Sequence, residues 1–293
     1  MSVEIRHAYA DVNGVRLHYA AAGAGPLVLF VHGFPEFWYE WRHQLEDFGR
    51  DHLAVAPDMR GYNLSSKPEG LEAYGVRHLV EDVRALVAHL GQRRFTLVAH
   101  DWGGAVAWAF ALTHPGLLER LVIINAPHPA VFARELRDNP LQQQASQYML
   151  VFRSPDAEGL LSADGHKRLR RALGEVWEQR FSDEDRRAYL EAWSRPGALT
   201  GGLNWYRAAR VGPPTSDEPS RSLSESSSLP VLEVPTLVIW GERDTALTTG
   251  NLVGLEQHVK HLTVRRVPDG THWVVHERPA EITAWIREFM EKS

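Results

Sequence analysis

Short, mostly apolar segments recur along the chain, and amphipathic segments separate most of them. The apolar segments cover residues 26–31, 53–56, 95–99, 121–124, 236–240 and 262–267. Apolar runs of this length are typical of strands that are buried on both faces of a parallel sheet. Helical periodicity follows at residues 76–90, 105–113, 250–257 and 279–291. This alternation predicts an α/β fold in which helices cover both faces of a mostly parallel central sheet.

The beginning and the middle of the chain depart from this alternation. Asn13-Gly14, between two short alternating segments, predicts a β-hairpin with a type I′ turn. Residues 131–229 show helical patterns and no convincing buried strand, and Ser182 with Asp185 predicts the start of one of these helices. We therefore expect a helical cap at 131–229, inserted into a core that residues 1–130 and 230–293 form. The cap should cover the carboxyl edge of the strands, where open α/β sheets bind ligands.

The end of the expected cap, residues 211–229, is rich in proline, serine and acidic side chains. Such a segment buries little apolar surface. We expect a flexible surface loop that returns the chain to the core, with a gating lid over the site as the alternative.

Composition narrows the class of protein. The 293 residues are 44% hydrophobic and 24% charged, as in an ordinary globular protein, and the formal net charge is -5. A mildly acidic chain is a poor partner for nucleic acid or an anionic membrane. The absence of cysteine excludes disulfides, thiolate metal sites and a cysteine nucleophile. With neither a signal-peptide pattern nor a membrane-length apolar run, the sequence predicts a cytoplasmic enzyme or binding protein.

A candidate nucleophile lies where the apolar segment 95–99 meets a helix. The intervening residues, Ala99 to Gly104, have the small-x-nucleophile-x-small pattern of a nucleophile elbow, with Asp101 at its tip. A carboxylate that attacks an sp³ carbon forms an ester, which activated water can hydrolyse. A serine would instead form an ether, which water does not readily cleave. Asp101 therefore favours epoxides or alkyl halides as substrates over carboxylic esters.

Hydrolysis of such an ester requires a base and an acid that orients it. His272 follows the last apolar segment, and Asp244 follows the one before it. The order Asp101, Asp244, His272 matches the nucleophile, acid and base order of this architecture. Glu242 is the weaker alternative to Asp244, and Asn125, at another strand end, is not acidic. Backbone N–H groups of Trp102 and Phe34 are the expected oxyanion hole.

Three motifs in the first half of the chain resemble those of the α/β-hydrolase-fold epoxide hydrolases of the soluble, bacterial type. They are His32–Glu36 with Trp38 and Trp41, Asp58–Tyr62 with Ser65 and Ser66, and His100–Gly104. The resemblance covers residues 12–289 and is weakest between 211 and 230. In two positions the chain departs from the pattern, with Asn63 in place of a glycine and Ala99 in place of another. We interpret Asp58, Arg60 and His100, which belong to the pattern, as structural.

The same resemblance maps two ring-opening tyrosines onto Tyr148 and Tyr206. A phenol can donate a hydrogen bond or a proton to the alkoxide that ring opening produces. The resemblance thus implies a detoxifying hydrolase that converts a small hydrophobic epoxide and water to a vicinal diol through an ester on Asp101. It implies no metal or cofactor, and it is compatible with a homodimer. The expected apolar pocket is lined by Phe34, Phe37, Trp102, Trp205 and Trp273.

Two other functions stay open at this stage. A haloalkane or haloacetate dehalogenase has the same fold, and Trp102 resembles the halide-binding tryptophan of the haloalkane enzymes. Against it, Phe34 stands where those enzymes usually place a halide-binding asparagine, and Trp102 stands where the haloacetate enzymes usually have arginine. A non-catalytic binding protein on this fold would be expected to lack a member of the triad, and here all three are present.

Overall fold

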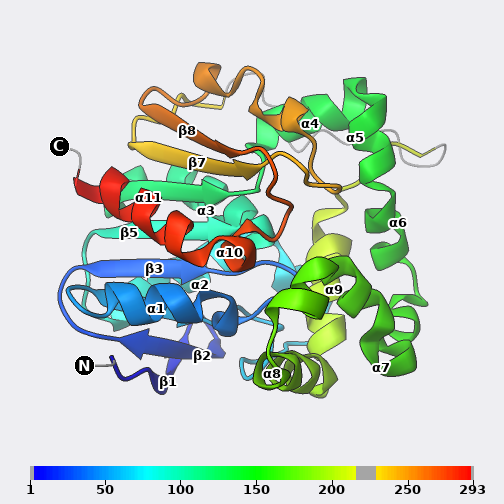
Figure 1. The fold of residues 1–293 in the computed structure, drawn as a ribbon, viewed down its shortest axis with the longest axis horizontal. Helices are drawn as coiled ribbons and strands as arrows, with labels where there is room; N and C mark the ends of the chain where they lie inside the picture. Colours follow the sequence, from blue (N-terminus) through cyan, green and yellow to red (C-terminus); the bar gives the residue numbers. More distant parts are fainter. Residues whose placement is uncertain (1–2, 216–228, 292–293) are drawn as a thin grey trace.

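The centre of the molecule is an eight-stranded sheet. The computed structural model describes residues 3–215 and 229–291, and within them the strand order is β1-β2-β4-β3-β5-β6-β7-β8 (Figure 1). The strands are β1 (Arg6–Val12), β2 (Val15–Ala22), β3 (Leu27–Val31), β4 (Leu53–Pro57), β5 (Phe95–His100), β6 (Leu118–Ile124), β7 (Thr236–Gly241) and β8 (Leu262–Val267). β2 is antiparallel to β1 and β4, and the other neighbouring pairs are parallel. The predicted α/β fold is confirmed.

The first two strands form the predicted hairpin. Val12 pairs with Val15, so the loop consists of two residues, Asn13 and Gly14. Their φ angles are 46° and 75°, and a type I′ turn requires positive φ at both central positions. Asparagine and glycine adopt such angles at low cost, which explains why this pair marked the turn.

Helices cover the sheet on both faces. α1 (Arg42–Phe48), α10 (Val274–Glu277) and α11 (Pro279–Glu291) lie on one face, and α2 (Val76–His89) and α3 (Asp101–Thr113) lie on the other (Figure 1). In β3, Leu27, Leu29 and Val31 pack in the cluster that includes α2 and α3. Val28 and Phe30 pack in the cluster that includes α1 and α11. Alternate residues of a strand point to opposite faces, so a strand with helices on both sides is apolar throughout.

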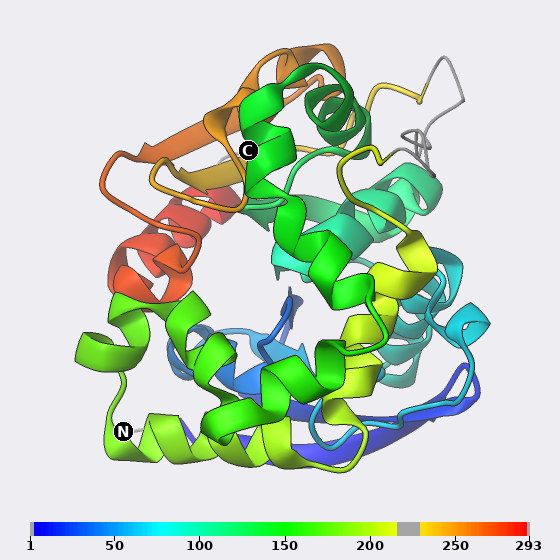
Figure 2. The ribbon, with the colours of Figure 1, turned by 90° about the vertical axis from the view of Figure 1, so that its right-hand side faces the viewer.

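Among the described residues between β6 and β7 there are six α-helices: α4 (Pro129–Asp138), α5 (Pro140–Ala145), α6 (Gln147–Arg153), α7 (Ala157–Leu173), α8 (Asp183–Ser194) and α9 (Ala198–Ala209). A π-helical turn, Val176–Arg180, precedes α8. Ser182 and Asp185 form the predicted capping box at the start of α8, because each side chain bonds to the other's backbone N–H. Seen from the side, α6 to α9 lie across one end of the sheet (Figure 2). We interpret this insertion as the cap and the remainder as the core.

Some local predictions differ from the structure. The helix predicted at 250–257 is wrong: the chain forms two short 3₁₀ turns, Thr249–Leu252 and Leu255–Gln257, because Gly254 between them has a left-handed φ of 79°. α3 begins at Asp101, four residues earlier than expected, and α1 was not predicted. Most of the loop expected at 211–229 lies outside the described residues. Among those described, no helix has both the length and the apolarity to cross a bilayer.

Candidate active site

The elbow brings Asp101 to the edge of the sheet. β5 ends at His100 and α3 begins at the next residue, so no loop separates them. Asp101 has a φ of 50°, in the left-handed region that non-glycine residues rarely adopt. A Cβ atom on Gly103 would lie 2.3 Å from the carbonyl oxygen of Val31, so a larger residue does not fit there. The strained tip and the small flanking residue are those expected of a nucleophile elbow.

The two carboxylate oxygens of Asp101 face different partners. Oδ1 accepts a hydrogen bond of 2.8 Å from the backbone N–H of Phe34, and Oδ2 lies 3.5 Å from Nε2 of His272. Burial acts to raise the pKa of Asp101, but the hydrogen bond to and the charge of His272 hold this pKa below its ordinary value. Asp101 is therefore ionised at neutral pH, as a nucleophile must be.

Asp244 holds the other side of the His272 ring. Its Oδ2 is 2.7 Å from His272 Nδ1 and accepts a 2.8 Å hydrogen bond from Nδ2 of Asn125. Its Oδ1 accepts bonds of 2.8 and 2.9 Å from the backbone N–H groups of Ala246 and Leu247. Glu242, the weaker candidate, instead pairs with an arginine of β8, Arg266. The carboxylate next to His272 is therefore fixed by donors on both oxygens.

Asn125 was considered in the sequence analysis only as a position for the acid and was set aside because it is not acidic, so its contact with Asp244 was not predicted. It has a φ of 38° at the end of β6, and its Oδ1 accepts a bond of 2.9 Å from the N–H of Gly241. Its amide thus links the ends of β6 and β7 to Asp244. An uncharged polar residue directly after a buried strand was the only signal available.

Two carboxylates raise the pKa of the candidate base, His272. Burial alone would lower the pKa of His272, but the nearby carboxylates of Asp244 and Asp101 raise it well above its ordinary value. Both carboxylates therefore favour the protonated form of His272. Removal of either negative charge lowers the pKa of His272 toward the range in which it can accept a proton.

The two candidate tyrosines come from separate cap helices and meet over the elbow. Tyr148 lies on α6 and Tyr206 on α9, with ring centroids 6.2 Å apart. Burial, followed by the charge of Asp101, raises the pKa of Tyr148 well above its ordinary value. Burial, followed by Tyr148 and Asp101, does the same for Tyr206. Both phenols are therefore neutral, and they can donate hydrogen bonds near the nucleophile.

Of the five expected pocket residues, two adjoin this tyrosine pair. The Trp102 and Phe34 rings contact the ring of Tyr206 at centroid distances of 5.0 and 5.5 Å. Both residues lie on the elbow side of the site, since Trp102 follows Asp101 and Phe34 bonds to it.

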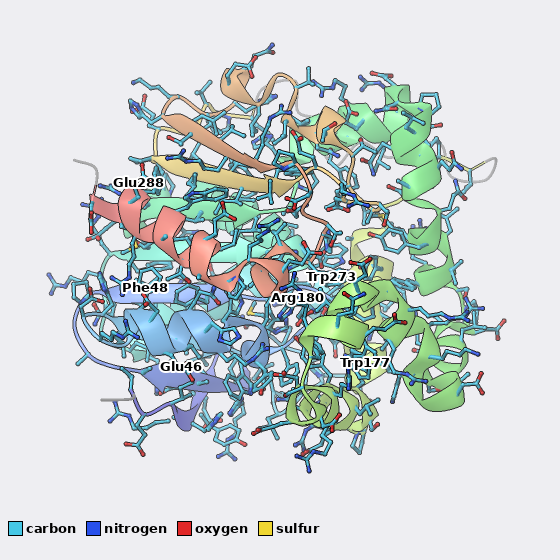
Figure 3. All side chains as sticks on the ribbon, in the orientation of Figure 1. Glu46, Phe48, Trp177, Arg180, Trp273 and Glu288 are labelled. Atoms are coloured by element: carbon cyan, nitrogen blue, oxygen red, sulfur yellow. The ribbon has the colours of Figure 1, made fainter. Side chains whose placement is uncertain are left out.

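The other three expected pocket residues join the cap to the core. Phe37 packs against Tyr189 of α8 at 5.1 Å. The indole N–H of Trp205, on α9, donates to the carbonyl of Arg60 at 3.1 Å, and that of Trp273 donates to the carbonyl of a cap residue, Ala172, at 2.8 Å. Figure 3 shows Trp273 at the junction between the two parts. Their contact with substrate stays a prediction.

A buried polar cluster also links the cap to the loop after β3, and no pattern in the sequence had indicated it. The hydroxyl of Tyr189, on α8, donates to Oε2 of Glu36. His276 Nε2 lies 3.3 Å from Glu36 Oε1 and 3.2 Å from the Tyr189 hydroxyl. Burial acts to raise the pKa of Glu36, but the charge and hydrogen bond of His276 bring it below its ordinary value. An ionised Glu36 therefore holds the two parts of the molecule together.

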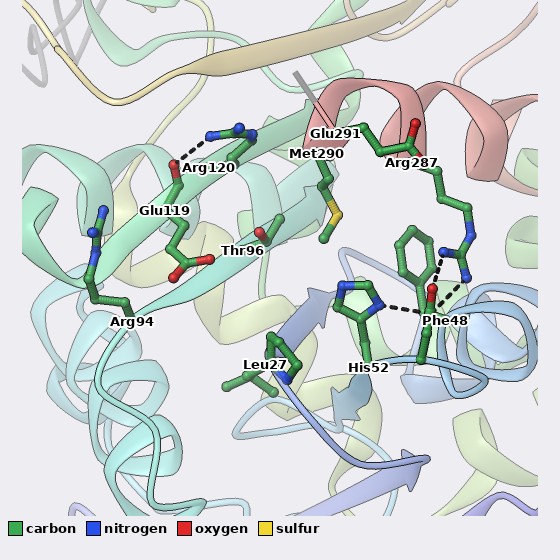
Figure 4. A pocket seen from close by; sticks show the side chains of 12 residues that line it. Leu27, Phe48, His52, Arg94, Thr96, Glu119, Arg120, Arg287, Met290 and Glu291 are labelled. Carbon is green, nitrogen blue, oxygen red and sulfur yellow. Dashed lines mark hydrogen bonds and ion pairs between the residues drawn. The ribbon is translucent and has the colours of Figure 1, made fainter. Parts of the chain in front are cut away.

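A separate hollow of about 510 Å³ lies at the opposite end of the sheet, near the starts of β3 and β5 (Figure 4). Several of its charged groups are already paired, since Arg287 and His52 both bond to Asp51. No residue predicted for the site lines it. Elsewhere in the described ranges, 3–215 and 229–291, no group of three or more histidines and carboxylates is arranged to hold a metal ion.

Comparison with known proteins agrees with the fold. The family model for the alpha/beta hydrolase fold matches residues 26–279, from just before β3 to the start of α11. The chain belongs to the α/β-hydrolase fold family. This α/β hydrolase is 39% identical over 288 residues to "AB hydrolase superfamily protein YfhM" of Bacillus subtilis, covering 97% of each chain. It is 33% identical to "Epoxide hydrolase 2" of Caenorhabditis elegans, covering 98% of this chain and 80% of the relative.

Solved structures give the same result. An epoxide hydrolase of Bacillus megaterium, solved with an inhibitor, superposes on this α/β hydrolase with a TM-score of 0.91 at 38% identity. The match covers 97% of this chain and 100% of the other. An epoxide hydrolase from metagenomes of hot environments has a TM-score of 0.86 at 39% identity, and both chains are covered completely.

Proposed function

We propose that this α/β hydrolase converts an epoxide to a vicinal diol through a covalent ester on Asp101. The observation that carries the proposal is the pair of neutral phenols, Tyr148 and Tyr206, near the ionised carboxylate of Asp101. An epoxide needs a nucleophile at carbon and a proton donor at oxygen, and this pair provides the donor. Relatives and structural neighbours that are named epoxide hydrolases support the assignment.

In the first step, an Asp101 carboxylate oxygen attacks a ring carbon while the bond from that carbon to the epoxide oxygen breaks. The oxygen becomes an alkoxide, which both phenols stabilise by hydrogen bonds and which takes a proton from one of them. The Asp101 carboxylate becomes a neutral ester. Because one of the two negative charges beside His272 is then lost, its pKa falls, and the proton that it releases restores the phenol.

In the second step, neutral His272 takes a proton from water, and the water oxygen attacks the carbonyl carbon of the ester. The Phe34 N–H, with the Trp102 N–H as second donor, stabilises the resulting oxyanion. Collapse breaks the ester, and the departing diol oxygen takes the proton from His272. The carboxylic acid left on Asp101 returns its proton to His272, which restores the resting ion pair.

The dehalogenase alternative depends on the Trp102 indole as a halide donor. In the structure the Trp102 ring packs edge-on against the Tyr206 ring, with centroids 5.0 Å apart. This contact favours a role beside the tyrosine pair over a free halide site. Cytoplasmic localisation, a hydrophobic substrate and a homodimer stay predictions.

The test is a single turnover with excess enzyme in water labelled with ¹⁸O, using styrene oxide. If the ester forms, the oxygen added in the first turnover comes from Asp101, so the diol is unlabelled and Asp101 acquires ¹⁸O. Labelled diol in that first turnover shows direct attack by water and overturns the covalent mechanism. Halide release from 1-bromobutane is measured in parallel, and halide without diol supports the dehalogenase.

A further inference from the structure

One helix of the cap, α8, binds the loop that carries the expected oxyanion donor. This loop, residues 32–37, follows β3, and the Phe34 N–H in it donates to Oδ1 of Asp101 at 2.8 Å. The loop backbone packs directly on the nucleophile, since a Cβ atom on Gly33 would lie 2.3 Å from the same oxygen. A shift of the loop therefore changes the direction of the Phe34 donor relative to Asp101.

Two buried side chains of α8 hold the residues that directly follow Phe34. The indole N–H of Trp193 donates to the carbonyl oxygen of Pro35 at 2.7 Å. The hydroxyl of Tyr189 donates to Oε2 of Glu36. Residues four apart lie on the same face of a helix, and the two rings pack together with centroids 5.5 Å apart. One face of α8 thus makes two adjacent contacts with the loop.

The contact at Pro35 complements one that the core makes earlier in the loop. Proline has no N–H, so hydrogen bonds can hold its backbone only through the carbonyl oxygen, and Trp193 supplies one. On the other side of Phe34, Nδ1 of His32 lies 2.8 Å from the carbonyl oxygen of Gly33. The Phe34 donor therefore lies between a segment that the core holds and a segment that the cap holds.

α8 is itself tied to the core at both ends. Near its start, Asp185 forms an ion pair of 3.0 Å with Arg42 of α1. Directly after its end, Arg195 donates to Oδ1 of Asn63, in the loop after β4, at 2.8 Å. The residues that bind the oxyanion loop lie between these two anchors, so the helix provides a fixed support for that loop.

The Phe34 donor affects the two proposed steps differently. Ring opening consumes the negative charge on Asp101, so the donor stabilises the starting carboxylate more than the ester that forms. Hydrolysis converts the neutral ester carbonyl to an oxyanion, so the donor stabilises the transition state more than the ester. Misdirection of this N–H should therefore slow hydrolysis without slowing ring opening.

We propose that Trp193 and Tyr189 are positioning residues, which hold the loop after β3 from the cap so that the Phe34 N–H faces the oxyanion of ester hydrolysis. The inference rests on the proposed function, because this oxyanion belongs to its second step. The two ring-opening tyrosines lie on α6 and α9, not on α8. An effect confined to hydrolysis therefore separates this role from a general disturbance of the cap.

The test compares Trp193→Phe with Trp177→Phe. The first substitution removes the indole N–H that binds Pro35 and keeps an aromatic ring. Trp177 is the control, because it is also a buried tryptophan of the cap and stacks on Trp193 with ring centroids 5.7 Å apart. Ester formation and ester hydrolysis are measured separately in single turnovers of styrene oxide, by intact mass and by diol release.

We expect Trp193→Phe to hydrolyse the ester about 5–10-fold more slowly and to accumulate it, as loss of a buried hydrogen bond implies. Ring opening should not be slower. Tyr189→Phe should slow hydrolysis by a smaller factor, because His276 still binds Glu36. Wild-type hydrolysis in Trp193→Phe overturns the proposal. Equal slowing of both steps, or an equal effect of Trp177→Phe, also overturns it by showing a general effect of cap packing.

Hydrogen exchange measured by NMR provides a test that does not depend on turnover. In the wild type, the Trp193 indole N–H should exchange far more slowly than an exposed indole. Exchange at the exposed rate overturns the proposal, even if Trp193→Phe does not fold. The Phe34 amide should exchange faster in Trp193→Phe than in Trp177→Phe, and equal rates overturn the proposal. If the wild type forms no ester but these rates differ as expected, the proposed function fails while the support of the loop by α8 stands.

Discussion

Single residues in this site act through the partners that hold them. Asp244 accepts four hydrogen bonds, of which His272 provides one and Asn125 another. A buried carboxylate needs such donors, because an unpaired charge inside a protein is strongly unfavourable. Asn125 therefore helps to hold Asp244, and through Asp244 it acts on the orientation of the proposed base, His272.

Asn125→Leu tests this contribution. The substitution preserves volume but removes a charge-assisted hydrogen bond worth about 1.5–3 kcal/mol, so turnover should fall about 10-fold or more. Asn251→Leu is the control, because Asn251 is also buried and its amide bonds to Gln142, away from the triad. The control should lose stability in urea unfolding and keep its turnover. Equal turnover in both variants would contradict a role for Asn125 in the site.

Asp101→Asn tests the electrostatic link between nucleophile and base. Asp101 raises the pKa of His272, so its replacement by an uncharged amide should lower that pKa relative to the wild type. The change is measured by NMR titration of the His272 ring, in protein shown by mass to be free of deamidation. Turnover should be lost because no nucleophile remains. An unchanged titration would mean that ester formation cannot switch the base.

The tyrosine pair provides a matched set of variants. Tyr148→Phe and Tyr206→Phe should each leave residual ring opening, because one phenol remains near Asp101. The double variant should lose ester formation, which intact mass follows directly. Wild-type ester formation in the double variant would show that the two phenols only pack against each other.

Among the elements, α9 approaches the core more closely than a side chain permits. A Cβ atom on Gly201, in this helix, would lie 2.2 Å from the carbonyl oxygen of Gly61, in the loop after β4. Since α9 also carries Tyr206, this contact between two backbones sets the distance of that phenol from the elbow. A glycine within a helix is unfavourable by itself, so its presence here has a packing reason.

Gly201→Ala should displace α9 and destabilise the protein by about 1–3 kcal/mol, the usual effect of overpacking. Gly159→Ala is the control in another cap helix, where an added Cβ meets nothing within 4 Å. Gly159→Ala should stabilise the protein by about 0.5–1 kcal/mol, because alanine has a higher helix propensity than glycine. Urea unfolding measures both, and ring-opening rates should fall only for Gly201→Ala. Similar effects in both variants would show that the close approach has no consequence.

Across the whole molecule, the cap and the core are joined by a buried charge. Glu36, after β3, binds Tyr189 of the cap and His276 of α10. Its pKa in the folded state lies below the reference value of 4.5. A carboxyl with a depressed folded pKa stabilises the native state above its unfolded pKa, and this stabilisation is lost as the pH falls through the folded value.

Glu36→Gln should therefore be less stable than the wild type at neutral pH. The difference should shrink as the pH is lowered toward and below ~4, where the wild-type carboxyl takes up its proton. Urea unfolding at a series of pH values measures it. A difference that stays constant or grows on acidification would contradict an ionised Glu36.

A site residue could be predicted from the sequence where its position follows from the strand before it, and could not be predicted where its role depends on a contact with a residue distant in the sequence. Asp101 and Asp244 each follow a buried strand and His272 follows the edge strand β8, so their meeting at one sheet edge could be inferred from local pattern. Glu36 and His276 are 240 residues apart, and nothing near either one signals the other. The prediction of a helix at 250–257 was wrong for a local reason. It gave more weight to the apolar spacing of the segment than to Gly254, which adopts a left-handed conformation.

The position of the cap within the chain has a consequence for biosynthesis. β6 pairs with β7, yet all the cap helices lie between them, and both Asp244 and His272 follow β7. A ribosome therefore completes the nucleophile, the tyrosine helices and most of the sheet before it adds the acid and the base. In the proposed mechanism, the nascent protein would carry its nucleophile before the residues that hydrolyse the ester. An epoxide that reached Asp101 in that interval would be retained as an adduct until the last strands are in place.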